Sequence, residues 1–214
     1  MNKQMHRKTN YIQKTGNILL LIMVSALAIL FPFSWIGESI GLPFNNMLTG
    51  EGIRYFLSIL PLSCSTHMMS LTISLIICIS TWKESGFGKQ ILYNINHQTG
   101  VKPTFRQRQA FNIALTFLCI YFFTMVCMSI GNNAVLLNIK GELLPSEQMM
   151  GIILSTLITL TFVSLLYGIM SHQLRGWNNI ISSLYTGFGT YGVWILVVMT
   201  ATLLYDAILF ALIP

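Results

Sequence analysis

Residues 59–108 join a long apolar run to a strongly basic segment, and this pairing constrains the fold of the whole chain. Positions 59–82 contain no Asp, Glu, Lys or Arg. Because a helix rises about 1.5 Å per residue, such a run is long enough to cross about 30 Å of hydrocarbon. The next segment, residues 83–109, carries five Lys and Arg residues and a single acid, Glu84. An excess of Lys and Arg stays on the cytoplasmic side during insertion, so the pattern predicts a membrane span followed by a cytoplasmic loop.

The composition places the protein in the membrane class. Of its 214 residues, 54% are hydrophobic and 8% are charged, whereas a soluble domain has about 25% charged residues. The net charge of +6 would also suit a nucleic-acid partner. However, the basic residues lie in short segments between apolar runs, where they set membrane topology. We therefore expect an integral membrane protein with no sizeable soluble domain and no nucleic-acid partner.

Five apolar runs predict an all-α, multi-pass helical bundle. These runs cover residues 17–35, 59–82, 110–129, 149–170 and 188–213. They follow a cytoplasmic tail, residues 1–16, and form a single transmembrane domain over residues 17–214 that includes the basic loop 83–109. Residues 85–95 of that loop suit a short interfacial helix. Pro61 is expected in the first turn of the second span, where proline is tolerated.

The first apolar run has a competing interpretation, because a positive start before an apolar run is also the pattern of a signal peptide. The small-x-small site Ala26-Leu27-Ala28 lies inside the run and leaves a short apolar region before it. A retained first helix is therefore favoured. Cleavage would not change the orientation of the later spans.

Charge alternates along the chain in a way that predicts orientation. The inner segments 1–16, 83–109 and 171–187 hold four, five and one of the 12 Lys and Arg residues. The outer connections 37–56 and 131–148 hold one each, and four of the six acidic residues. This asymmetry predicts the amino terminus inside and the carboxyl terminus outside. The long apolar runs also differ from the short alternating segments of a β-barrel.

The cysteines predict neither a disulfide framework nor a metal site. Cys64, Cys78, Cys119 and Cys127 all fall within or beside apolar runs, where a free cysteine behaves as a small hydrophobe. Cys64 and His67 are three residues apart and could share a helix face. Two ligands do not make a zinc site, so packing is the favoured role, and no cofactor is expected.

Ionisable residues inside spans are functional hypotheses by default. Asp206 is the one acid within a predicted span, so it is a candidate for ion or proton coupling. Its place about two turns from the chain end favours the alternative, a residue that water reaches at the membrane interface. His67, in the outer half of the second span, is a candidate acid or base, but a packed hydrogen-bonding role is favoured.

Small and weakly polar residues recur in the spans, where they favour close helix packing over a polar path. They are Ser70, Thr72, Ser74, Ser80, Ser155, Thr156, Thr159, Thr161, Ser164, Gly187, Gly189 and Gly192. No Gly-rich phosphate loop, zinc-protease motif or Ser/His/Asp arrangement is visible in the sequence. An enzyme is therefore not expected.

Three short blocks carry a family resemblance. They are Leu48-Thr49-Gly50-Glu51-Gly52-Ile53-Arg54-Tyr55, then Lys83-Glu84-Ser85-Gly86-Phe87, and finally Leu166-Tyr167-Gly168-Ile169-Met170 followed by Asn178, Ile180 and Tyr191. In order and spacing the blocks resemble the p-aminobenzoyl-glutamate transporter (AbgT) family, whose signatures include Glu-x-Ser-Gly-Leu and a later Tyr-Gly segment. The resemblance implies helices and re-entrant hairpins of a dimeric, cation-coupled transporter or drug exporter.

The resemblance also implies where a solute site would lie. The family's hairpin tip, Asn-Phe-x-x-Phe-x-Pro-Leu-Gly, corresponds to residues 63–71, which read Ser-Cys-Ser-Thr-His-Met-Met-Ser-Leu. The family's Ser-Asp-Ala-Gly stretch corresponds to residues 129–134, where no carboxylate remains. No counterpart of the family's second half is visible. The substrate-binding residues implied are Ser63, Ser65, Thr66, His67, Asn132 and Asn133.

The leading functional hypothesis is a transport-related protein of the bacterial inner membrane, a shortened and divergent relative of that family. It would move or export a small organic solute such as a p-aminobenzoyl-glutamate-like anion, which Asn, Ser and His would hold by neutral hydrogen bonds. The alternative is a non-transporting scaffold or accessory subunit that has lost the family's coupling residues. The partners expected are the lipid bilayer, a small organic solute, and either a second copy or another membrane subunit.

Overall fold

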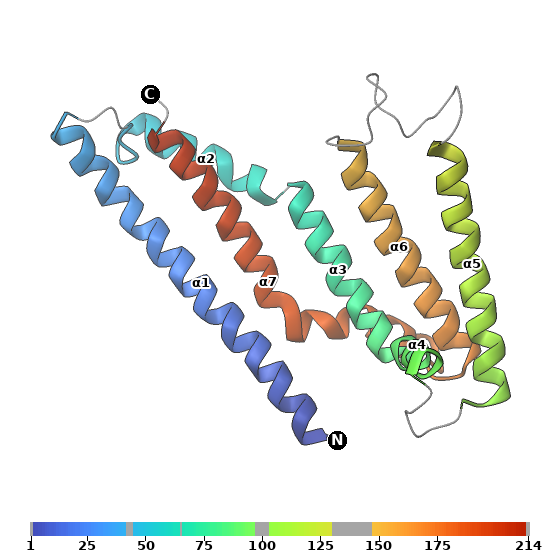
Figure 1. The fold of residues 1–214 in the computed structure, drawn as a ribbon. Helices are drawn as coiled ribbons and strands as arrows, with labels where there is room; N and C mark the ends of the chain where they lie inside the picture. The colour runs from blue at the N-terminus through green and yellow to red at the C-terminus, as the bar shows by residue number, and fades with distance from the viewer. Residues whose placement is uncertain (1, 42–44, 65, 97–102, 130–146, 213–214) are drawn as a thin grey trace. The chain divides into compact units, whose positions relative to one another are not determined.

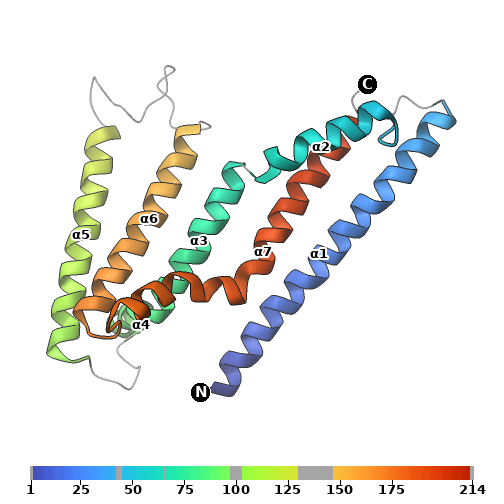
Figure 2. The ribbon, with the colours of Figure 1, turned by 180° about the vertical axis from the view of Figure 1, so that it is seen from behind.

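The computed structural model describes residues 2–41, 45–64, 66–96, 103–129 and 147–212, and these residues form helices and turns without a strand. The helices are α1 (Asn2–Ser39), α2 (Gly50–Cys64), α3 (His67–Glu84), α4 (Phe87–Asn96), α5 (Phe105–Ser129), α6 (Glu147–Met170) and α7 (Trp177–Leu212). Figures 1 and 2 show them from opposite sides. The predicted all-α class is confirmed.

Five helical stretches are long and apolar enough to cross a membrane, as predicted. They are Tyr11–Ser39, Gly50–Glu84, Phe105–Met128, Met149–Met170 and Trp177–Leu212. The second stretch runs through α2 and α3 together. The five helical stretches fit a multi-pass membrane protein, whereas the side on which each terminus lies stays a prediction from charge.

Several predicted boundaries are wrong. The predicted connections 37–56 and 171–187 are shorter in the structure, since α2 begins at Gly50 and α7 begins at Trp177. The residues by which α2 and α7 exceed the predicted spans are polar or flank polar residues, so hydropathy excludes them from an apolar run. A helix is held by backbone hydrogen bonds whether or not its side chains are apolar, so it can continue past the edge of its apolar stretch. The short helix suggested for residues 85–95 is confirmed as α4.

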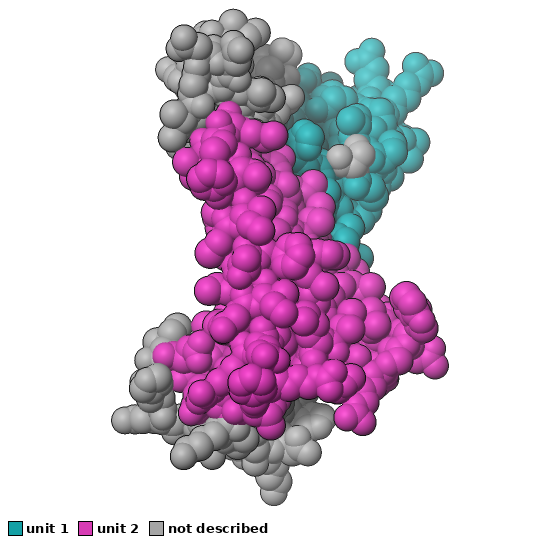
Figure 3. All heavy atoms as spheres, turned by 90° about the vertical axis from the view of Figure 1, so that its right-hand side faces the viewer, with its two compact units in different colours: residues 1–73, 190–214 teal, residues 74–189 magenta. Residues whose placement is uncertain are grey.

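The chain divides into two compact units, coloured separately in Figure 3. Unit 1 consists of residues 1–73 and 190–214, and unit 2 consists of residues 74–189. The helices α3 and α7 therefore each contribute to both units.

In unit 1, α1 lies beside the second part of α7 (Figures 1 and 2). A Cβ added to Gly16 would lie 3.1 Å from Cγ1 of Val193, so the two helices approach closely there. The Thr200 hydroxyl donates a hydrogen bond to Sδ of Met23 at 3.8 Å. Small residues at such crossings let helices pack within a membrane, where apolar transfer supplies little driving force.

The segment before α2 fastens that helix to the rest of unit 1. The Asn45 side-chain amide donates to the Phe210 carbonyl at 3.0 Å, and the Asn45 backbone N–H donates to the Ala211 carbonyl at 3.1 Å. These bonds satisfy carbonyls in the last turn of α7. The buried Met47 donates its N–H to the Ser34 hydroxyl of α1 at 3.1 Å.

The first turn of α2 is capped by a threonine. The Thr49 hydroxyl accepts a hydrogen bond from the Gly52 N–H at 3.3 Å, and the Thr49 carbonyl accepts one from the Ile53 N–H at 3.0 Å. A side-chain oxygen at this position satisfies one of the N–H groups that a helix start leaves unpaired. This explains why α2 begins at Gly50, nine residues before the predicted span.

In unit 2, α5 and α6 pack along their length and α4 lies against α6. A buried cluster joins them, made of Phe87, Ala110, Phe111, Ala114, Val163 and Tyr167. The Phe87 ring lies 5.4 Å from the Tyr167 ring and 5.7 Å from the Phe111 ring, centroid to centroid. Aromatic contacts at such centroid distances stabilise a cluster beyond their buried area.

Candidate functional site

The second predicted span is interrupted. The helix α2 ends at Cys64 and α3 begins at His67, so the continuous helix predicted over residues 59–82 is wrong. Pro61 lies in the last turn of α2, not in the first turn of a helix. Because proline lacks an N–H and its ring clashes with the carbonyl four residues earlier, it weakens the helix just before the interruption.

Hydroxyl groups bridge the interruption. Ser63 is only 1% exposed, and its hydroxyl donates to the Ile59 carbonyl at 3.1 Å. The Thr66 hydroxyl donates to the Ser63 carbonyl at 3.1 Å. The Thr66 carbonyl accepts the Met69 N–H at 3.0 Å, which begins the next helix. Each hydroxyl oxygen still has lone pairs with which to accept a hydrogen bond from a ligand.

The interruption lies against α7. The Cys64 thiol and the Met199 thioether are 4.0 Å apart, sulfur to sulfur. His67, at the start of α3, has an exposed side chain. Cys64 and His67 end one helix and begin another, so they do not share a helix face as the sequence suggested. Among the residues that the structure describes, no group of three or more His, Cys, Asp or Glu side chains could hold a metal.

The other predicted site residues are not brought to the interruption. Asp206 is partly buried in α7 and lies two helical turns beyond Met199, about 10 Å along the helix axis. Its role in ion or proton coupling stays a prediction. Ser65, Asn132 and Asn133 lie outside the described residues, so their part in the site also stays a prediction.

The hydroxyls of α6 support packing and not a polar path. Each donates to a carbonyl of its own helix: Ser155 and Thr156 to Ile152, Thr159 to Ser155, Thr161 to Leu157 and Ser164 to Thr161. The Tyr121 hydroxyl of α5 also bonds those of Ser155, at 2.8 Å, and Thr156, at 3.1 Å. These bonds join α5 to α6, as the prediction of close helix packing requires.

Ser80 of α3 inserts its hydroxyl into the backbone of α7 within unit 2. Its oxygen donates to the Ser183 carbonyl at 2.6 Å and accepts the Gly187 N–H at 2.8 Å. In an uninterrupted α-helix this carbonyl and this N–H pair with each other. A Cβ on Gly187 would lie 2.7 Å from the Ser80 Cβ, so this approach requires glycine.

Two of the blocks that carry the family resemblance meet in unit 2. Gly86 has φ +69° and turns the chain from α3 into α4. This turn buries Phe87 against Tyr167, as described above. A Cβ on Gly168 would lie 3.0 Å from the Ser85 Cβ. Residues of the two motifs therefore pack against each other at the turn between α3 and α4. Glycine at position 168 allows the two backbones to approach closely there.

Sequence reasoning missed the interruption itself and the contact between Cys64 and Met199. The signal in the sequence is Pro61, which the apolar pattern places at the start of a span and the structure places in the last turn of α2. Comparison of the chain with protein-family models, with curated proteins and with solved structures gave no match.

Proposed function

We propose that this protein is a transport-related protein of a bacterial inner membrane and a divergent relative of the p-aminobenzoyl-glutamate transporter family. In this proposal it binds a small organic anion at the interruption between α2 and α3. The observation that carries the proposal is the break in an apolar span between Cys64 and His67. Non-helical backbone at membrane depth is tolerated only where protein buries it or where it lines a cavity, and transporters build midplane sites from such broken helices.

The groups at the break suit an anion that is held by neutral hydrogen-bonding groups and a helix dipole, without a positively charged side chain. The start of α3 carries the positive end of the helix dipole and leaves the His67 and Met68 N–H groups without a partner inside the helix, whereas those of Met69 and Ser70 bond to the Thr66 carbonyl. The His67 imidazole lies at this end and can donate a hydrogen bond to the anion. The Thr66 hydroxyl, whose hydrogen is bonded to the Ser63 carbonyl, can accept a hydrogen bond from an amide or amine N–H of the solute. Ser63, fully buried on the α2 side, fixes the approach of the two helices through the Thr66 bond.

The thermal stability of the purified full-length protein tests this proposal. We expect a saturable rise in melting temperature with one member of a panel of p-aminobenzoyl-glutamate, sulfonamides and dicarboxylates, with sodium present or absent. A ligand at 100 times its Kd stabilises the folded state by about 2.7 kcal/mol. Losing one hydrogen bond to a charged ligand costs about 1.5–3 kcal/mol, so Thr66→Val and His67→Ala should each weaken binding about tenfold or more.

Thr72→Val is the matched control, because the Thr72 hydroxyl donates to the Met68 carbonyl within α3, a full turn beyond the interruption. Its ligand response should equal that of the parent. Parent-like binding by the Thr66 and His67 variants would contradict the assignment of the site. No response to any solute would favour the accessory-subunit alternative, which predicts instead that another membrane protein copurifies with this chain.

A further inference from the structure

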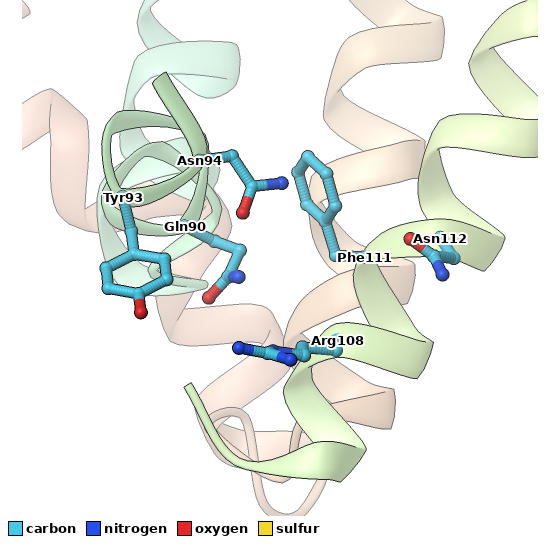
Figure 4. Close-up of a pocket in the computed structure, with 6 residues that line it drawn as sticks. All are labelled: Gln90, Tyr93, Asn94, Arg108, Phe111 and Asn112. Atoms are coloured by element: carbon cyan, nitrogen blue, oxygen red, sulfur yellow. The ribbon is translucent and has the colours of Figure 1, made fainter. Parts of the chain in front are cut away.

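A polar cavity lies between α4 and the beginning of α5 in unit 2, with a volume of about 470 Å³. Its lining consists of Gln90, Tyr93, Asn94, Arg108, Phe111 and Asn112. In Figure 4, Asn94 extends from α4 toward Phe111, whereas the Gln90 amide points downward and the Arg108 guanidinium of α5 lies below it. The cavity shares no residue with the interruption between α2 and α3.

Gln90 is the most informative residue of this cavity. Its side chain is 6% exposed, yet its amide forms no hydrogen bond within the part of the chain that the structure describes. A buried amide without a partner costs about 1–3 kcal/mol. Such groups are rare in folded proteins and usually mark a place that a ligand, an ion or water occupies. Gln90 therefore points to a ligand in the cavity that it lines.

The rest of the lining favours an anion. The cavity contains the guanidinium of Arg108 and no acidic side chain. Neighbouring Arg106 is engaged elsewhere, since its Nε donates to the Met170 carbonyl at the end of α6 at 3.1 Å. No ion pair within the described ranges occupies Arg108. An arginine fork matches the oxygens of phosphate in a bidentate manner, and amide N–H groups add further donors.

We propose that this cavity binds a phosphate-bearing anion. Arg108 pairs with the phosphate oxygens, the Gln90 and Asn94 amides donate to them, and the Phe111 ring forms the apolar wall. The phosphate belongs either to an anionic phospholipid headgroup or to a free phosphate, since both present the same oxygens. The charge pattern predicts that the basic loop 83–109, which contains Gln90 and Arg108, faces the cytoplasm, where basic pockets between membrane helices recognise anionic headgroups.

The test uses full-length protein stripped of lipid in a neutral detergent and compares two phosphate sources by thermal stability. One arm adds inorganic phosphate at an ionic strength matched with chloride. The other adds mixed micelles containing phosphatidylglycerol, with phosphatidylcholine micelles as the neutral comparison. Stabilisation by phosphatidylglycerol alone assigns the site to a lipid headgroup, and stabilisation by inorganic phosphate shows that the site binds free phosphate. No response to either probe overturns the proposal.

Two variants separate the cavity from general charge attraction. Arg108→Gln should weaken the apparent affinity about tenfold or more, since a hydrogen bond to a charged group contributes about 1.5–3 kcal/mol. Arg175→Gln removes the same charge from an exposed arginine between α6 and α7, outside this cavity, and should respond like the parent. Equal losses in the two variants would overturn the proposal.

The variant Gln90→Met provides a second test of the cavity in case the Arg108→Gln substitution also disturbs folding. Methionine has a similar length and no polar group, so it removes the unpaired amide from the buried position. We expect the lipid-free variant to melt at a higher temperature than the parent while its response to the phosphate probe falls about tenfold. A variant that melts lower, or that binds the probe like the parent, would contradict the role given to Gln90.

Discussion

Replacing Gly52 with alanine should destabilise the protein by about 3 kcal/mol, near the upper end for an overpacked position. A Cβ at Gly52 would lie 2.5 Å from the Met47 Cα and 2.6 Å from the carbonyl oxygens of Asn46 and Met47. These are backbone atoms of the segment that fastens α2 to α1 and α7, so no side-chain rotation relieves the clash. Equilibrium unfolding of the detergent-solubilised protein with increasing SDS measures the change.

Gly50→Ala is the matched control for this prediction. Gly50 begins the same helix two residues earlier, and an added Cβ there has no atom within 4 Å. We expect a change within about 0.5 kcal/mol, as is usual for a surface substitution. Equal destabilisation by the two alanines would show that the loop before α2 does not pack against Gly52 as the structure describes.

Replacing Gly187 with alanine should cost about 2 kcal/mol, again through overpacking. The new Cβ would lie 2.7 Å from the Ser80 Cβ and 3.0 Å from the Ile76 carbonyl oxygen. Pushing α3 away from α7 also breaks the two bonds through which the Ser80 hydroxyl holds the Ser183 carbonyl and the Gly187 N–H. The same SDS titration measures the loss.

Gly189→Ala is the control within the same helix. An added Cβ at Gly189 has no atom within 4 Å, and alanine favours a helix over glycine by about 1 kcal/mol. The variant should therefore equal the parent or exceed it slightly in stability. If Gly187→Ala were as stable as Gly189→Ala, the close approach between α3 and α7 would be refuted.

The number of spans could be predicted from sequence because hydrocarbon imposes a minimum length on an uncharged run. The helix ends could not be predicted in the same way. Asn178 and Asn179 precede the last apolar run, yet the structure includes them in α7, where the Asn179 side chain donates to the Arg175 carbonyl at 2.8 Å. Polar side chains that bond to the backbone in this way extend a helix beyond its apolar part, and a hydropathy pattern does not predict that extension.

The interruption within the second span was predictable only in part. Hydropathy is continuous across residues 59–82, so the apolar pattern predicts one helix with Pro61 in its first turn, whereas the family resemblance implies a hairpin tip at residues 63–71. The cavity at Gln90 and Arg108 has no sequence signal of its own. It exists because the turn at Gly86 brings α4 back against α5 and α6 within unit 2, a tertiary contact that no local pattern encodes.

The motif residues of the family resemblance have a structural role in this protein. Gly86 turns the chain, and Tyr167 is buried against Phe87. These residues shape the end of unit 2, whereas the proposed solute site depends on Thr66 and His67. The two sets are therefore separable by experiment, since only the second set should change solute binding without changing the stability of the protein.

Solute flux into sealed proteoliposomes tests the central proposal most directly. The protein is reconstituted at known density, and the labelled solute that gave the strongest thermal stabilisation is added outside the liposomes. We predict saturable uptake above that of protein-free liposomes, reduced about tenfold or more in the Thr66→Val, His67→Ala double variant and unchanged in Thr72→Val. Uptake equal to that of protein-free liposomes, or equal uptake by the parent and the double variant, would contradict a transport role for the interrupted span.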